Sequence, residues 1–484
     1  MLRVDREPSL NIACVGAGYV GGPTCAVIAH KCAHHRVTVV DISEERIAAW
    51  NSDELPIYEA GLSDIVKECK GRNLFFSTDV DGAINEADII FLAVNTPTKA
   101  NGVGAGFASD LTYLEAAVRR VVKVARRSKI LVEKSTVPCR TAESIAQVAA
   151  ANARPGVHFQ VLSNPEFLAE GTAIHDLLHP DRILIGCMPT EDGLKAQELL
   201  TNIYAKWIPR KKIIGMHLWS SELAKLAANA LLAQRVSSIN AISAICEAVG
   251  ADVGEVATAC GQDSRIGPHF LTASVGFGGS CFRKDILNLV YLSNALKLPQ
   301  VAKYWEQVNL MNEYQQHRFS KRILAALFNT ISDKHIAVLG FAFKKGTSDS
   351  RESPAINVVS DLLSEGANIR IHDCKVPSKQ IFRDLACSLA NGRGSVEVCE
   401  TPYQAAMNAH ALVILTDWAD YQTLDYKAIY CSMSKPAYLF DGRSIVDEQE
   451  VRQIGFDVHI IGRARERSLP RLYQNVLADS RAVV

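Results

Sequence analysis

The sequence predicts an α/β protein with two Rossmann-like, doubly wound domains, joined by a long central helix and a helical linker domain. In the N-terminal part, short apolar runs alternate with helical patterns, which is typical of a parallel, doubly wound sheet. The C-terminal third repeats this plan more loosely. A long helical stretch without Gly or Pro lies between the two.

The N-terminal domain, expected over residues 1–215, begins with a buried strand that leads into glycines. The helix after the glycines is expected to end near Lys31. The expected strands are residues 10–15 (LNIACV), 37–41 (VTVVD), 87–94 (ADIIFLAV) and 129–133 (KILVE).

The central helical dimerisation domain is expected over residues 216–330. Its main element is a helix from Trp219 to Val249, which is rich in Ala and Leu, has Ser220 as its N-cap and is followed by Gly250. A helix of about 30 residues spans ~45 Å, enough to bridge two domains.

The C-terminal Rossmann-like domain is expected over residues 331–462. Residues 335–340, 367–373 and 411–415 echo the first three strands of the N-terminal domain. The turn after the first of them, Gly340–Gly346 (GFAFKKG), lacks the G-x-G-x-x-G pattern, so a nucleotide would be held there by other contacts. Residues 463–484 are polar and basic, and a loosely ordered tail is expected.

The composition excludes several classes of protein. The 484 residues are 48% hydrophobic and 21% charged, as in soluble globular proteins, and 52 basic residues balance 52 acidic ones. No overall charge therefore favours nucleic acid or a membrane. No apolar run approaches the ~18 residues of a membrane span, and the N-terminus does not resemble a signal peptide. The 13 cysteines contain no C-x-x-C pair, so we expect no disulfide framework, no metal site and a cytoplasmic location.

A dinucleotide fingerprint follows the first strand. Gly16–Gly21 (GAGYVG) fits G-x-G-x-x-G, whose glycines allow a tight turn that brings the pyrophosphate to the helix N-terminus. Asp41 ends the second strand, where a carboxylate accepts the ribose hydroxyls and repels the 2′-phosphate of NADP. NAD is therefore favoured, although the nearby Arg46 could accommodate such a phosphate.

Cys281 lies in the glycine-rich run Val275–Asp285 (VGFGGSCFRKD) and is expected to open a helix, whose N-terminus favours the thiolate. Beside a nicotinamide site, a thiolate can capture an aldehyde as a thiohemiacetal, which is itself a hydride donor. This combination predicts oxidation of an alcohol in two steps to an acid, through a thioester. The alternative is a buried cysteine packed behind a turn.

Several motifs together resemble the UDP-glucose 6-dehydrogenase family, most of all its animal members, from about Ile12 to about Arg443. The motifs are residues 16–22 (GAGYVGG), 94–98 (VNTPT), 133–138 (EKSTVP), 163–171 (SNPEFLAEG), 223–229 (LAKLAAN) and 276–285 (GFGGSCFRKD). The resemblance implies oxidation of UDP-glucose to UDP-glucuronate, a glycosaminoglycan precursor, with two NAD reduced per turnover.

The catalytic residues that the resemblance implies are Cys281, Lys225, Glu166, Asp285, Asn229 and Thr136. Lys225 and Asn229 lie one helical turn apart and could stabilise the alkoxide and later oxyanions. Asp285 could hold or deprotonate the water that hydrolyses the thioester. By pattern alone, Lys225 is more typical of a solvated residue, Asp285 is as typical of one as of a catalytic acid, and Lys284 is expected at the surface.

Glu166 and Glu170 are also spaced four residues apart, and two crowded carboxylates raise one pKa, which suits proton shuttling. An exposed acidic turn is the alternative. The resemblance gives Glu166 acid–base work with Thr136 arranging water beside it, and places Glu170 at the cofactor. Which of Glu166, Lys225 and Asp285 takes the first proton stays open.

The resemblance also implies binding residues. Those expected at the cofactor are Gly16, Ala17, Gly18, Tyr19, Val20, Gly21, Asp41, Arg46, Val94, Asn95, Thr96, Pro97, Thr98, Ser135, Thr136, Val137, Glu170, Cys281 and Arg351. Those expected at the substrate are Glu166, Phe167, Leu168, Ala169, Glu170, Lys225, Asn229, Arg265, Thr272, Ala273, Ser274, Val275, Gly276, Phe277, Gly278, Phe343, Lys344 and Arg443. Thr272 stands where the family has a lysine. Lys344 and Arg443 would anchor a diphosphate, although each alone is more typical of a surface charge.

Arg265 corresponds to an arginine that enters the neighbouring subunit's substrate site. The resemblance therefore implies an obligate homodimer, and animal members suggest a hexamer built as a trimer of dimers. It also suggests allosteric feedback by UDP-xylose through the loop that carries Thr136.

Two alternatives remain. Sister enzymes that oxidise GDP-mannose or UDP-N-acetylmannosamine share the architecture and the cysteine. A non-catalytic nucleotide-sugar sensor would not need Cys281, Lys225 or Asp285, and all three are present.

Overall fold

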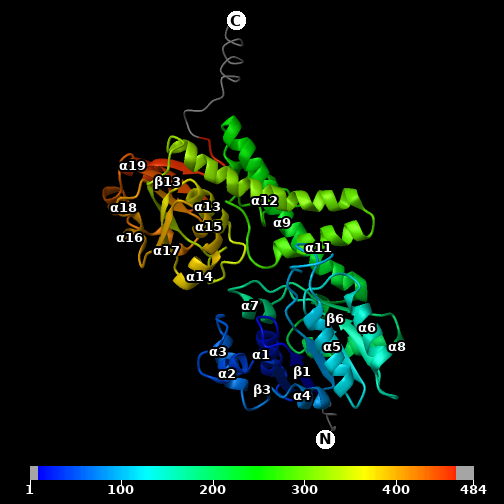
Figure 1. The fold of residues 1–484 in the computed structure, drawn as a ribbon. Coiled ribbons are helices and arrows are strands. Elements are labelled where there is room, and N and C mark those ends of the chain that lie inside the picture. The colour runs from blue at the N-terminus through cyan, green and yellow to red at the C-terminus, as the bar shows by residue number, and fades with distance from the viewer. Residues whose placement is uncertain (1–8, 465–484) are drawn as a thin grey trace. The chain divides into compact units, whose positions relative to one another are not determined.

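The structure is a computed structural model that describes residues 9–464 (Figure 1). Most of the predicted tail, residues 465–484, therefore lies outside the described residues. The chain divides into two compact units, one formed by Met1–Ala228 with Leu287–Leu296 and the other by Asn229–Ile286 with Lys297–Val484. Within residues 9–464, none of the helices combines the length and apolar character needed to cross a bilayer.

The first unit holds an eight-stranded sheet in the order β3-β2-β1-β4-β5-β6-β7-β8. The strands are β1 (Asn11–Val15), β2 (Arg36–Val40), β3 (Leu74–Ser77), β4 (Ile89–Leu92), β5 (Lys129–Glu133), β6 (Phe159–Ser163), β7 (Ile183–Cys187) and β8 (Ile213–His217). The four predicted strands, β1, β2, β4 and β5, are confirmed. The prediction of a parallel sheet holds for β1 to β6 only, because β7 pairs antiparallel with β6 and reverses the last two strands.

Helices cover both faces of this sheet, because alternate strand residues point to opposite sides. Ile12 and Cys14 pack into one buried cluster and Ala13 into another. The first cluster includes α1 (Gly21–Lys31), α2 (Glu44–Asn51), α3 (Leu62–Cys69), α7 (Ala173–Leu178) and α8 (Glu191–Tyr204). The second includes α4 (Val80–Glu86), α5 (Thr112–Val124) and α6 (Thr141–Asn152).

The long helix is confirmed as α9 (Leu218–Val249), which contributes residues to both units. It begins two residues before Ser220, so the prediction of Ser220 as its N-cap is wrong. Gly250 follows with φ +87° and donates its N–H to Cys246 O at 3.0 Å, as glycine does after a helix. The other central helices are α10 (Val253–Gln262), α11 (Phe282–Ala295) and α12 (Pro299–Ala326).

The second unit holds a six-stranded, all-parallel sheet in the order β11-β10-β9-β12-β13-β14. Its strands are β9 (His335–Leu339), β10 (Asn368–His372), β11 (Ser395–Val398), β12 (Ala411–Ile414), β13 (Tyr438–Asp441) and β14 (Asp457–Ile460). Its helices are α13 (Pro354–Ser364), α14 (Ser378–Asp384), α15 (Ala386–Asn391), α16 (Pro402–Ala406), α17 (Ala419–Gln422), α18 (Tyr426–Ser432) and α19 (Glu448–Ile454). The predicted strands β9, β10 and β12 are confirmed, and one buried cluster joins the sheet to its helices.

The two Rossmann-like sheets share the turn after their first strand. Gly16 and Gly340 both adopt positive φ, at +109° and +96°. Ala17 N–H donates to the Asp41 carboxylate at 2.9 Å, and Phe341 N–H donates to the Asp373 carboxylate at 2.6 Å. An acid at the end of the second strand therefore braces the turn in both sheets, which confirms the predicted repeat of plan.

Candidate active site

The glycines of the first turn have distinct roles. A Cβ atom on Gly16 would lie 2.4 Å from Ala93 O, and one on Gly21 would lie 2.0 Å from Gly16 O. A Cβ atom on Gly18 would have no neighbour within 4 Å. Gly16 and Gly21 are therefore needed for the turn itself, whereas Gly18 leaves its outer surface open for close approach of a pyrophosphate.

Asp41 is 8% exposed and fits the role of a ribose acceptor. Its carboxylate accepts hydrogen bonds from Ala17 N–H at 2.9 Å, Ser43 N–H at 3.0 Å and the Arg46 guanidinium at 3.0 Å. Burial acts to raise the pKa of Asp41, but these hydrogen bonds outweigh it and hold the pKa below its usual value. The Asp41 carboxylate therefore stays ionised, and the Arg46 guanidinium is paired with it.

The loops that follow β4 and β5 are tied together. Ser135 Oγ donates to Val94 O at 2.6 Å, and Thr96 Oγ1 donates to Thr136 O at 2.8 Å. These bonds connect the two loops in which the sequence predicts cofactor contacts.

Glu59 is a buried residue of the site that the sequence did not reveal. It is 5% exposed and accepts a hydrogen bond from the Tyr19 hydroxyl of the fingerprint. It also accepts the backbone N–H groups of Gly171 at 2.7 Å and Ala173 at 3.0 Å. The fingerprint and the segment that holds Glu170 are thus joined through one carboxylate.

Glu166 and Lys225 form a buried ion pair in the first unit. Their side chains are 9% and 5% exposed, and Glu166 Oε1 lies 3.3 Å from Lys225 Nζ. Lys225 Nζ also lies 5.1 Å from the centre of the Phe167 ring. The alternatives of a solvated Lys225 and an exposed Glu166 are therefore wrong.

Glu166 and Glu170, four residues apart in the sequence, do not lie on a helix. Both residues lie in the segment between the end of β6 at Ser163 and the start of α7 at Ala173, which contains no helix. Glu166 Oε2 instead accepts the N–H of Leu168 at 2.6 Å, which fixes the carboxylate against its own loop.

Lys134 and Asn164 also belong to the site, but the sequence did not identify them as site residues. They lie in the motifs at residues 133–138 and 163–171. Lys134 is 3% exposed and donates to Asn164 Oδ1 at 3.1 Å, which also accepts the Tyr204 hydroxyl at 2.7 Å. Burial lowers the pKa of Lys134 to about 8, while the charge of Glu166 opposes this shift. A second buried amine, that of Lys134, thus accompanies the Glu166–Lys225 pair.

Cys281 is exposed and immediately precedes α11 in the second unit. Its carbonyl accepts the N–H of Asp285 at 2.9 Å, so the predicted helix start is confirmed and the alternative of a buried cysteine is wrong. Asp285 is 1% exposed and accepts a hydrogen bond from Asn229 Nδ2 at 2.6 Å. The alternative of a solvated Asp285 is wrong as well, and Lys284 is half-buried.

The glycine-rich loop before Cys281 is held by α12. Phe277 N–H donates to Asn312 Oδ1 at 2.9 Å, and Asn312 Nδ2 returns a bond to Phe277 O at 3.0 Å. Gln315 Nε2 donates to Ser274 O at 2.8 Å. Within this stretch Ala273 and Val275 are buried, whereas Thr272 is exposed.

The basic residues expected at the ligands differ in their surroundings. Arg443 is half-buried and donates to Leu415 O at 2.7 Å and Phe343 O at 2.9 Å, so it is no ordinary surface charge. Lys344 Nζ lies 5.7 Å from the centre of the Phe343 ring. Arg265 and Arg351 have side chains that are 87% and 59% exposed, and each pairs with an aspartate two residues earlier.

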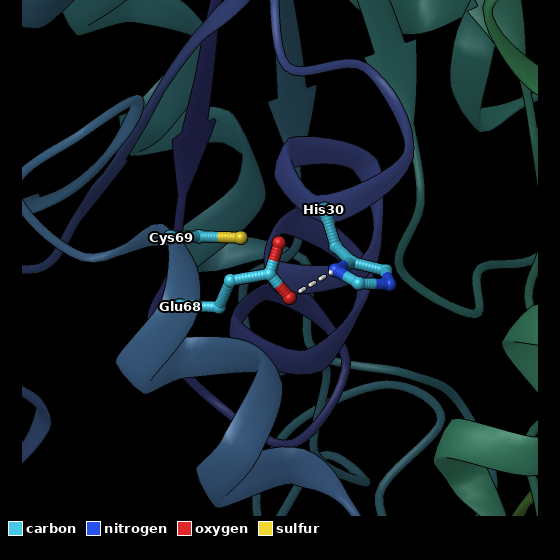
Figure 2. Close-up of side chains that lie close together, drawn as sticks. All are labelled: His30, Glu68 and Cys69. Carbon is cyan, nitrogen blue, oxygen red and sulfur yellow. Dashed lines mark ion pairs between the residues drawn. The ribbon is translucent and has the colours of Figure 1, made fainter.

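One cluster of metal-ligand type occurs among the described residues, at His30, Glu68 and Cys69 (Figure 2). His30 Nδ1 lies 3.0 Å from Glu68 Oε2, and the Arg72 guanidinium donates to Glu68 and to Cys69 Sγ, each at 3.5 Å. Arg72 pairs with the Glu68 carboxylate, and burial raises the pKa of the Cys69 thiol, so hydrogen bonds and ion pairs account for the cluster without a metal ion. His30 lies in the last turn of α1, whereas the fingerprint lies at the N-terminus of that helix.

The fold and the fingerprint define a dinucleotide-binding protein of the Rossmann type. Residues 10–208, 219–314 and 337–448 match the NAD binding, central and UDP binding domains of the UDP-glucose/GDP-mannose dehydrogenase family. The chain belongs to this family.

Full-length relatives and solved structures agree. The chain is 58% identical over 464 residues to UDP-glucose 6-dehydrogenase of Drosophila melanogaster, covering 95% of this chain and 98% of the relative. It is 57% identical to the mouse enzyme of that name, covering 94% of this chain and 93% of the relative. A UDP-glucose dehydrogenase structure from Pyrobaculum islandicum is 31% identical, with a TM-score of 0.82, covering 96% of this chain and 100% of that chain.

Proposed function

We propose that this chain is an NAD-dependent UDP-glucose 6-dehydrogenase, which oxidises UDP-glucose to UDP-glucuronate and reduces two NAD per turnover. The observation that carries the proposal is its 58% identity, over nearly the whole chain, to a relative of that activity. The exposed Cys281 at a helix start supplies the nucleophile that a two-step oxidation needs. The matches to residues 10–208, 219–314 and 337–448 support a division into domains at 1–215, 216–330 and 331–462.

The residues of the first turn fit NAD. Bound NAD would accept a hydride from the substrate carbon in each oxidation. Asp41 would receive the ribose hydroxyls, and the open surface over Gly18 would receive the pyrophosphate. The loops at residues 94–98 and 135–137, with Glu170 and Arg351, would complete the cofactor contacts.

The buried Glu166–Lys225 pair would manage the first proton. The carboxylate of Glu166 would take the proton of the substrate C6 hydroxyl, directly or through a water held by Thr136. The ammonium of Lys225 would stabilise the oxyanions that develop, with the amide of Asn229 one turn further along α9. Low exposure of the pair supports this assignment, because electrostatic interactions are strong where water is excluded.

Cys281 would carry the second oxidation. Its thiolate forms a C–S bond with the aldehyde, and the oxyanion takes a proton to give a thiohemiacetal. Loss of a hydride and of that hydroxyl proton gives a thioester. A water held by Asp285 then attacks the thioester, which breaks the C–S bond, returns the thiolate and releases the carboxylate. The reaction requires the thiol, the acid–base groups and the hydride acceptor to act at the same carbon.

UDP would be held by the C-terminal domain and by the loop before Cys281. The proposed contacts are Phe343, Lys344, Arg443 and the backbone of Ser274–Gly278. The loops at Glu166–Glu170 and Thr272–Ala273 would add substrate contacts. A UDP-N-acetylmannosamine dehydrogenase of Pyrococcus horikoshii is only 27% identical, which favours UDP-glucose over that substrate.

The first experiment measures NADH formed per UDP-glucose consumed, with the sugar nucleotide limiting. A ratio of two supports the double oxidation, and a ratio of one would contradict the covalent role of Cys281. Cys281→Ser is expected to stop after the first hydride transfer or to lose activity. GDP-mannose and UDP-N-acetylmannosamine serve as competing substrates, and faster turnover of either would overturn the assignment.

Assembly and regulation belong to the same proposal. Arg265, with its 87% exposed side chain, would complete the site of a neighbouring subunit in an obligate homodimer, and three dimers would form a hexamer. UDP-xylose would inhibit through the loop of Thr136. The hexamer and the inhibition by UDP-xylose are inferred from animal members of the family. Because a rice relative is as similar to this chain as the mouse one, at 57% identity, both properties have to be measured on this protein. A cytoplasmic location is part of the proposal.

A further inference from the structure

Glu133, the last residue of β5, is a buried carboxyl that the proposed reaction does not use. It is 1% exposed, and neither of its oxygens accepts a hydrogen bond from an N–H or O–H group of the described residues. The side chain that acts on Glu133 is another carboxyl, that of Glu222 in the first turn and a half of α9. A buried carboxylate without a donor is strongly unfavourable, so Glu133 has to gain a proton.

Glu222 is the carboxyl of the two that has hydrogen-bond donors, which oppose the rise in its pKa that burial causes. It is 2% exposed, its Oε2 accepts Arg140 N–H at 2.6 Å, and its Oε1 accepts Ala142 N–H at 2.7 Å. These N–H groups belong to the N-terminus of α6, where a negative charge is stabilised. The two carboxyls are therefore unequal, since one has backbone donors and the other has none.

The other ionisable groups nearby do not neutralise the pair. The Cys139 thiol donates to Trp219 O at 3.4 Å, and burial raises the pKa of that thiol to about 11, so it is uncharged at neutral pH. The Arg140 side chain is turned to Glu143, 2.7 Å away. Lys134 donates to Asn164. Burial and the neighbouring charge of Glu222 raise the pKa of Glu133 well above its usual range.

We propose that Glu133 and Glu222 share one proton, and that this proton fixes the segment from Lys134 to Ala142 between β5 and α6. Glu133 donates its O–H to Glu222, and Glu222 holds the start of α6. Both ends of the segment are thus attached to one residue of α9. Loss of the proton places two facing charges between β5 and α6 and releases the segment. The pair are positioning residues for Thr136, a consequence that rests on the proposed function.

Hydrogen exchange read by mass spectrometry tests the proposal on the full chain. The protection of the backbone amides of residues 134–142 is compared at pH 7 and pH 10, after correction for intrinsic exchange rates. It is expected to fall by about tenfold or more, because release of one proton destabilises the segment. Glu133→Gln, whose amide donates at every pH, is expected to keep its protection. Glu191→Gln removes a charge whose side chain is 83% exposed and is expected to behave as the natural chain. Equal pH dependence in Glu133→Gln and the natural chain would overturn the proposal.

Infrared spectroscopy of the natural chain gives a second test that does not depend on how a variant folds. A protonated carboxylic acid has a C=O stretch that a carboxylate lacks. The band is expected at pH 7, and its absence would overturn the proposal. Neither measurement needs turnover, so both decide this inference even if no NADH is formed from UDP-glucose.

Discussion

At the scale of single residues, the candidate site of the first unit contains buried charges that lie close together. Glu166 and Lys225 compensate each other, and Lys134 adds a second buried amine, whose pKa burial lowers to about 8. Removing one member of a buried pair leaves the other uncompensated, which typically costs about 3–5 kcal/mol. Variants here should therefore preserve shape and hydrogen bonding.

Glu166→Gln keeps the shape of the side chain but removes its charge and its basicity. We expect kcat to fall by about a hundredfold or more, because general acid–base catalysis contributes ~10²–10⁴-fold. The KM for NAD should change little. Glu191→Gln, at a side chain that is 83% exposed, is the matched control. Retention of kcat in Glu166→Gln would exclude Glu166 as the base.

Gly16→Ala and Gly18→Ala separate folding from cofactor binding. The alanine at 16 meets a backbone oxygen at 2.4 Å and is strained at φ +109°, so the Tm should drop. The alanine at 18 meets nothing within 4 Å, so the Tm should hold while the KM for NAD rises. Equal Tm losses in thermal melts of the two variants would contradict this division of roles.

Lys134→Met tests the cost of burying an amine. Its folded pKa of about 8 lies below the ordinary 10.5, so the unfolded chain binds more protons between these values. The natural chain therefore gains stability as pH rises from 8 to 10.5, and below pH 8 it carries a constant penalty, at most about 3 kcal/mol. Lys134→Met should lack this dependence. Denaturant unfolding of both chains at pH 8 and pH 10 measures it, and parallel pH profiles would refute the buried, shifted amine.

At the scale of elements, helices position the loops that carry the chemistry. The start of α11 places Cys281 and, through the bond from Asn229, connects Asp285 to α9. The helix α12 holds the loop before Cys281 through side-chain amides that bind its backbone. A loop with several glycines needs such outside restraint, because its own backbone is conformationally free.

Asn312→Ala should loosen this loop. It leaves the buried N–H and C=O of Phe277 without their partner, which typically costs about 1–3 kcal/mol. The KM for UDP-glucose should rise by about tenfold, as expected for a loss of ~1.4 kcal/mol in binding, with the KM for NAD unchanged. Steady-state kinetics in which UDP-glucose and NAD are varied in turn measure the two KM values. Asn391→Ala, on the exposed side of α15, is the control.

At the scale of the whole molecule, the chain is built from two Rossmann-like sheets with the same braced turn, and α9 contributes to both units. Only the first sheet has the G-x-G-x-x-G pattern. The proposed division of labour, with NAD on the first sheet and UDP on the second, follows the family domains matched by each.

Arg265→Ala tests whether the working enzyme needs more than one chain. The side chain is 87% exposed, so its loss should leave the Tm unchanged. If Arg265 completes a neighbouring site, the KM for UDP-glucose should rise by about tenfold or more, since charged hydrogen bonds contribute ~1.5–3 kcal/mol. Steady-state kinetics measure the KM for UDP-glucose, and sedimentation of the same variant measures its oligomeric state. An unchanged KM in an intact oligomer would argue against a shared site.

The sequence by itself determined the elements whose signals are local. The strand–turn–helix at Gly16, the long helix α9 and the helix start at Cys281 are specified by neighbouring residues, and the resemblance supplied the family. The tertiary structure decided what depends on distant contacts: the reversal of β7 and β8, the burial of Lys225 and Asp285, and the bracing by Glu59. Burial and the sharing of a proton between Glu133 and Glu222 arise only when segments far apart in the chain pack together, and no local pattern encodes them.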